Sequence, residues 1–81
     1  MSTKELHVLQ FWLRATKKCF VDLGAVSAGQ VGRYVGQSRS TAKKYLDRLV
    51  SEGALWSIEE PARNGVMARL YGPTNPKADK S

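Results

Sequence analysis

Residues 26–55 have the sequence VSAGQVGRYVGQSRSTAKKYLDRLVSEGAL, and this stretch decides the fold. Ser27 and Gln30 have the spacing of a capping box, in which a serine that begins a helix and a glutamine three residues later bond each other's backbone N–H groups. Gly36 is suited to end that helix, because glycine readily adopts the left-handed conformation found at helix C-termini. Ser38 follows two residues later as the cap of another helix. The stretch therefore predicts two helices joined by a tight turn.

The two predicted helices differ in length and character. The first is short, and its inward residues are expected to be Val31, Tyr34 and Val35. The second spans residues 39–52 and ends at Gly53. Its inward residues have the i, i+4, i+7, i+8 spacing of a half-buried helix: Ala42, Leu46, Leu49 and Val50. At about 100° per residue, the outward face then carries Ser40, Lys44, Asp47 and Arg48, with Thr41 at its margin.

A further helix is predicted upstream of this stretch. Ser2 and Glu5 have the capping-box spacing that begins it. Its apolar stripe is expected to consist of Leu6, Leu9 and Leu13. Lys17 and Lys18 are expected in its last turn, where cations complement the helix dipole, and a turn is expected at residues 22–24.

A β-hairpin is predicted downstream, over residues 54–72. Its strands are the runs from residue 55 to about 59 and from residue 66 or 67 to 71. Its tip lies near Arg63–Gly65, because Asn-Gly favours a turn with both central residues at positive φ. A very short strand is also expected at residues 25–26. The predicted fold class is therefore α+β, mainly α, with three helices and a C-terminal hairpin of a two- or three-stranded sheet.

The composition favours an anionic partner such as nucleic acid. The 81 residues include 13 Lys+Arg against 7 Asp+Glu, a formal net charge of +6. A single cysteine excludes an intrachain disulfide, and a single histidine without acidic residues clustered beside it predicts no metal site. No catalytic constellation is found. We therefore expect a basic binding module that is not an enzyme and has no cofactor and no small-molecule ligand.

One domain is expected over residues 1–72, followed by a flexible tail over residues 73–81. The tail contains no large apolar residue, so it cannot bury enough surface to offset the entropy lost on ordering. No stretch approaches the ~18 consecutive apolar residues of a membrane-spanning helix, and the first residues lack the layout of a secretory signal. The expected location is the cytoplasm, in association with the nucleoid.

Residues 26–55 together with the hairpin resemble a winged helix-turn-helix, and are similar to small bacterial and archaeal transcription regulators of the MarR-like and ArsR-like groups. The closest parts of the motif are residues 36–41 and 45–49, followed by Glu52-Gly53. Gly32 departs from the pattern, because alanine is usual where the second helix packs on the third. Gly29 and Gly32 each cost about 0.5–1 kcal/mol relative to alanine, which predicts a less rigid second helix.

The resemblance implies that the helix at 39–52 lies in the major groove of double-stranded DNA. The residues expected to contact DNA are Ser27, Arg33, Gln37, Ser38, Arg39, Ser40, Thr41, Lys43, Lys44, Arg48, Arg63 and Asn64. Arg39 and Lys44 are assigned to guanine and Gln37 to adenine, while either Ser40 or Thr41 reads a base.

The other expected contacts are to the DNA backbone or minor groove. Lys43 and Arg48 are assigned to phosphates, together with Ser27 and Arg33 at the preceding helix. The tip residue Arg63, with Asn64 beside it, is assigned to the adjacent minor groove or backbone. Asp47 is an acid on the basic face. It either orients Arg48 or Lys43, or accepts a hydrogen bond from cytosine N4.

Val8, Phe11 and Trp12 lie outside the predicted stripe of the first helix. They are either covered by the hairpin or form the interface of a two-fold homodimer through the first helix. The leading function is a sequence-specific DNA-binding transcription regulator. The alternatives are a winged-helix module that binds proteins, and a viral or plasmid DNA-binding protein with a role outside transcription.

Overall fold

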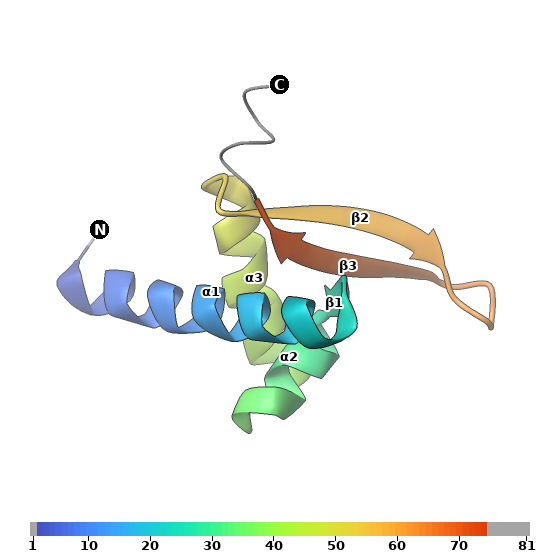
Figure 1. The fold of residues 1–81 in the computed structure, drawn as a ribbon, viewed down its shortest axis with the longest axis horizontal. Helices are drawn as coiled ribbons and strands as arrows, with labels where there is room; N and C mark the ends of the chain where they lie inside the picture. Colours follow the sequence, from blue (N-terminus) through green and yellow to red (C-terminus); the bar gives the residue numbers. More distant parts are fainter. Residues whose placement is uncertain (1, 75–81) are drawn as a thin grey trace.

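A computed structural model of the chain describes residues 2–74. Its elements, in chain order, are α1 (Thr3–Leu23), β1 (Val26–Ser27), α2 (Ala28–Val35), α3 (Arg39–Ser51), β2 (Leu55–Pro61) and β3 (Met67–Pro73). This is a mainly helical α+β fold, which confirms the predicted class. The hairpin of β2 and β3 projects past the end of α1 (Figure 1). Pro73 belongs to β3, and residues 75–81 of the predicted tail lie outside the described residues.

The three strands form one antiparallel sheet in the order β1-β3-β2. Strand β1 pairs with β3 through Val26↔Tyr71 and Ser27↔Leu70. The hairpin is in register from Leu55↔Pro73 to Pro61↔Met67. Strand β1 therefore joins the hairpin to the helices, because α2 begins at the residue that follows it.

The hairpin turn differs from the predicted one. Gly65 has a φ of 81°, but Asn64 does not have a positive φ, so the expectation of two such residues is wrong. The Gly65 N–H donates to the Ala62 carbonyl and the Ala62 N–H to the Val66 carbonyl, both at 2.9 Å. This pattern is typical of a three-residue loop, in which the four-residue turn Ala62–Gly65 ends at a left-handed glycine.

Helix α1 is longer than predicted and buries a different face. Ser2 caps it by accepting from the Glu5 N–H at 3.2 Å, and it continues to Gly24, whose φ is 81°. Lys17 and Lys18 are therefore not in its last turn. Its buried residues are Leu9, Trp12, Ala15, Thr16 and Cys19. Of the predicted stripe, Leu6 is 46% exposed and Leu13 is half-buried.

The indole of Trp12 explains this rotation of the buried face. Trp12 stacks on Tyr45 of α3, with ring centroids 5.6 Å apart and an interplanar angle of 16°. Burying so large an aromatic side chain removes more apolar area from water than burying Leu6, so α1 turns Trp12 toward the core. The Trp12 carbonyl also accepts a hydrogen bond from the hydroxyl of buried Thr16, with the two oxygens 2.8 Å apart.

Helices α2 and α3 form largely as the sequence predicts. The capping box of Ser27 and Gln30 is present, and Gly36 ends α2 with a φ of 75°. The predicted inward residues Val31, Ala42, Leu46 and Leu49 are all buried, and Val35 and Val50 pack against them. Tyr34 is the exception: it is 54% exposed, so its predicted inward position is wrong.

At Gly32, α2 packs closely against the inter-helix turn and the start of α3. A Cβ added there would lie 2.9 Å from the Gln37 carbonyl oxygen, 3.0 Å from the Ser38 carbonyl oxygen and 3.3 Å from the Ala42 Cβ. Glycine is therefore required at this position, because an added methyl group would overlap the backbone of the turn between the two helices. The expectation of a less rigid α2 stays a prediction.

We expect Gly32→Ala to destabilise the fold by about 1–3 kcal/mol, because the overlapping atoms are backbone and cannot rotate away. Gly29→Ala is the matched control. The nearest atom to an added Cβ is 3.8 Å away there, so the alanine should stabilise α2 by about 0.5–1 kcal/mol. Urea unfolding of the three proteins measures both changes. Equal effects at the two positions would contradict the close approach.

Candidate nucleic-acid interface

The start of α3 presents most of its predicted DNA-contacting side chains to solvent. The exposed residues in this region are Gln37, Ser38, Arg39, Ser40, Lys43, Lys44 and Arg48. Thr41 is half-buried at the margin of this face. Ala42 and Leu46 are fully buried on the opposite side, in agreement with the predicted orientation of the helix.

Two of the predicted contact residues, Ser38 and Ser27, cap helices. The Ser38 Oγ accepts from the Thr41 backbone N–H at 3.2 Å and donates to the Thr41 Oγ1 at 3.0 Å. The Ser27 Oγ accepts from the Gln30 N–H at 3.3 Å, and the Gln30 Oε1 accepts from the Ser27 N–H at 2.9 Å. These hydroxyls fix the starts of α3 and α2, which positions the longer polar side chains nearby.

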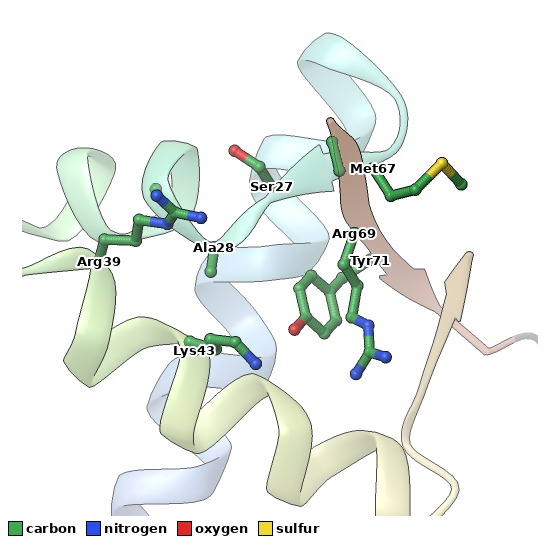
Figure 2. A pocket seen from close by; sticks show the side chains of 9 residues that line it. Ser27, Ala28, Arg39, Lys43, Met67, Arg69 and Tyr71 are labelled. Atoms are coloured by element: carbon green, nitrogen blue, oxygen red, sulfur yellow. The ribbon is translucent and has the colours of Figure 1, made fainter. Parts of the chain in front are cut away.

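A cleft of about 390 Å³ lies between α3, the start of α2 and β3. Figure 2 shows Arg39 and Lys43 extending from α3, with Arg69 and Tyr71 on β3 across the cleft. Side chains two residues apart on a strand share a face, which places Arg69 beside Tyr71. Arg69 was not among the predicted contacts. Its i, i+2 spacing from Tyr71 places both side chains on one face of β3, but does not show that this face meets α3.

Asp47 is the centre of a polar network between α3 and the hairpin. Its carboxylate accepts from the Lys43 Nζ at 2.9 Å and from the Tyr71 hydroxyl at 2.5 Å. The Arg69 guanidinium lies 3.6 Å from Asp47 and 3.3 Å from Glu59 on β2. Of the two cations proposed as partners of Asp47, the structure therefore pairs it with Lys43, and the hydrogen bond to cytosine N4 stays a prediction. Tyr71, missed as a site residue, ties the hairpin to α3.

This network shifts two pKa values in opposite directions. Partial burial acts to raise the pKa of Asp47, but the hydrogen bonds from Tyr71 and Lys43, with the charges of Lys43 and Arg69, outweigh it and lower the pKa below its usual value. Burial of the phenol, then its hydrogen bond to Asp47 and the charge of that carboxylate, raises the pKa of Tyr71 to about 12.

We expect an absorbance titration to show a tyrosine ionisation near pH 12 that is missing in Tyr71→Phe. The folded pKa lies above the unfolded value of about 10, so the stabilisation is complete below pH 10 and is lost as the pH rises toward 12. The variant also lacks the hydrogen bond to a carboxylate, worth about 1.5–3 kcal/mol. A step near pH 12 that persists in Tyr71→Phe contradicts the assignment.

Lys44 and Arg48 lie on the side of α3 that faces the start of α1. The Lys44 Nζ lies 5.5 Å from the centroid of the Tyr45 ring. Arg48 pairs with Glu52 at 2.6 Å, so its predicted pairing with Asp47 is wrong. Glu5 lines the same hollow of the surface as Lys44 and Arg48. The structure therefore separates these two cations from the cleft that holds Arg39 and Lys43.

The remaining predicted contacts lie on α2 and at the hairpin tip. Arg33 is exposed in the last turn of α2, far along the helix from Ser27. Arg63 and Asn64 are exposed in the loop between β2 and β3, which Figure 1 shows well away from the helices. The Asn64 Oδ1 accepts from the Val66 N–H at 3.2 Å, so Asn64 stabilises the loop and leaves Arg63 as its only long cationic side chain.

The three candidate dimer residues have different environments. Trp12 is 3% exposed and packs in the core against Tyr45, so its assignment to a dimer interface is wrong. Val8 is half-buried against the same core. Phe11 is 50% exposed and is the one large side chain of the three that faces solvent. A homodimer through α1 stays a prediction.

Other kinds of site find little support in residues 2–74. This part of the chain contains no group of three or more His, Cys, Asp or Glu side chains arranged to hold a metal ion. None of the helices it contains is long and apolar enough to cross a membrane.

Comparison with known proteins adds no assignment to this geometry. No protein-family model, curated protein or solved structure matches the chain. The exposed face of α3, the cleft beside it and the hairpin tip are thus the observations from which a function is argued.

Proposed function

We propose that the chain is a winged helix-turn-helix protein that binds double-stranded DNA sequence-specifically and regulates transcription. The order of elements supports the fold: a short strand follows the first helix, two helices follow it, and β3 of the closing hairpin lies between β1 and β2. In this proposal α2 and α3 are the helix-turn-helix, with its turn at Gly36, and the β2–β3 hairpin is the wing.

The exposed, basic N-terminal part of α3 is the observation that carries the proposal. Residues 39–48 contain four basic residues and a single acid, and that acid, Asp47, is already paired with Lys43. A helix with such a face fits the major groove, where residues near its N-terminus reach base edges. Arg39 forms no ion pair within residues 2–74, so we assign it to guanine, and exposed Gln37 to adenine.

Phosphate contacts are assigned to the cations around this helix. They are Arg33, Lys43, Arg48, Arg63 and the newly identified Arg69. Arg69 and Lys43 line the cleft between α3 and β3, and Arg63 extends the surface to the hairpin tip. Such contacts fix the position of a protein on the duplex without reading its sequence.

A salt titration of duplex binding tests the proposal. For a duplex selected from a random library, the logarithm of the association constant is expected to fall linearly with the logarithm of the salt concentration. The slope is about −0.9 per phosphate contact. Five contacts predict a slope of about −4.5, or roughly a 500-fold loss between 50 and 200 mM salt. Fluorescence anisotropy measures the affinity at each salt concentration. If the chain uses this fold only to bind proteins, no duplex binding is expected even at low salt, and that result would contradict the proposal. Duplex binding with a salt slope near zero would contradict it as well.

A further inference from the structure

A second surface, between α1 and α2, is apolar at its floor. A groove of about 440 Å³ runs between these helices, and its floor consists of Phe11, Ala15, Tyr34 and Val35. Phe11 is 50% and Tyr34 is 54% exposed, and neither ring belongs to the buried core that contains Trp12. Exposed aromatic side chains gathered in a concave surface are typical of binding sites.

The rim of this groove is entirely basic. Arg14, Lys17 and Lys18 line it, all three are exposed, and no acidic residue lines it. Within residues 2–74, none of the three takes part in an ion pair. The groove therefore combines an apolar floor with uncompensated positive charge on its α1 side.

We propose that this groove binds an amphipathic helical segment of a partner protein, with acidic residues flanking its apolar anchors. Such a helix places residues at i, i+3, i+4 and i+7 into a groove, which fits the aromatic floor formed by Phe11 and Tyr34. Its carboxylates then face the three cations of the rim, and this complementarity selects the partner and speeds the encounter.

A second copy of the chain fits this groove less well. A two-fold interface places the same surface on both sides, so Arg14, Lys17 and Lys18 would meet their own copies. Like charges brought together at an interface cost several kcal/mol. A single-stranded nucleic acid would satisfy the cations and stack on the rings, but the floor offers its polar base edges only the Tyr34 hydroxyl.

The groove is independent of the proposed DNA interface. It shares no residue with the cleft beside α3, and none of its residues comes from α3 or the hairpin. Arg33, which is assigned to phosphate, precedes Tyr34 in α2 but does not line the groove. The proposal therefore stands or fails separately from DNA binding.

NMR of the isotope-labelled chain, titrated with a designed peptide, tests the groove. The probe is a peptide of about 15 residues with leucine at i, i+3, i+4 and i+7 and glutamate at the flanking positions. We expect shift changes at Phe11, Ala15 and Tyr34 but not at the start of α3. Phe11→Ala and the double variant Lys17→Glu/Lys18→Glu are each expected to weaken binding at least tenfold, as is replacing the glutamates of the peptide by glutamine.

The matched controls are Val21→Ala and Lys4→Glu. Val21 is an exposed apolar residue of α1 outside the groove, and Lys4 is an exposed cation near its start, so neither change should alter binding by more than about twofold. Any of four results would overturn the proposal. The first is that the chemical shifts of the groove residues do not change, and the second is that the peptide with glutamine in place of glutamate binds equally well. The third is that the groove shifts change with protein concentration in the absence of peptide. The fourth is that a single-stranded oligonucleotide of equal charge displaces the peptide.

Discussion

Arg39→Ala is expected to raise the Kd for the preferred duplex by roughly 5- to 150-fold, a loss of about 1–3 kcal/mol. The side chain is exposed at the first position of α3 and forms no ion pair within residues 2–74, so its full set of N–H donors is available to a guanine edge. Affinity for unrelated duplexes should change far less, and the base preference at one position should relax.

Arg63→Ala supplies the contrasting result for the same assay. A phosphate contact carries no sequence information, so this variant should weaken binding to all duplexes alike and reduce the salt slope by about 1. Lys4→Ala, an exposed cation at the start of α1, serves as the neutral control. If Arg39→Ala weakens the preferred and unrelated duplexes equally, Arg39 contacts phosphate and the base assignment is wrong.

Gly72→Ala is expected to destabilise the fold by about 3 kcal/mol, close to the effect of removing a buried tryptophan side chain. Gly72 pairs with Trp56 across the hairpin, and an added Cβ would overlap the indole, with Cε2 and Cη2 only 2.6 and 2.8 Å away. The indole cannot swing aside without losing its edge-on contact with Phe20, 6.0 Å between centroids. Covering a strand glycine with an aromatic ring is a recognised way to stabilise a sheet.

A double-mutant cycle separates the ring from the backbone. In a Trp56→Ala background the space above Gly72 is empty, so Gly72→Ala should cost less than about 1 kcal/mol there. For a domain of this size each kcal/mol shifts Tm by about 4–8 °C, so thermal unfolding resolves the two cases. An undiminished cost in the Trp56→Ala background would show that the backbone of β3, and not the indole, excludes the side chain.

The elements that sequence analysis located best are those fixed by neighbouring residues. Ser27 and Gln30 form their capping box, and Gly36 takes its left-handed conformation, because these interactions span only three or four residues. The hairpin was located for a similar reason. Its loop was wrong in detail because Asn-Gly is compatible with more than one turn, and the strand pairing decides which forms.

Features that depend on distant residues were less accessible. The apolar residues of α1 allow two overlapping inward faces, and only the position of Tyr45 on α3 shows why Trp12 is chosen over Leu6. Gly32 looked like a weak point for the same reason, since its contact is with the next helix.

The part of the candidate site missed by sequence analysis joins two separate segments, α3 and β3. Asp47 and Tyr71 are 24 residues apart, and Arg69 reaches Asp47 only because the hairpin folds back along α3. No pattern within either segment reveals that pairing. The basic face of α3 was predictable because it follows from the helical period alone.

Ser27 gives the domain a stiff junction. It is paired with Leu70 in the sheet and is also the N-cap of α2. The last residue of β1 is therefore followed directly by the first turn of a helix. No freely rotating residue separates the hairpin from the helix pair. For a duplex bound as proposed, Arg39 and Arg63 are then held at a fixed separation. A duplex whose grooves do not match that separation must bend to contact both, so base steps that bend at low energetic cost are favoured at positions no side chain touches.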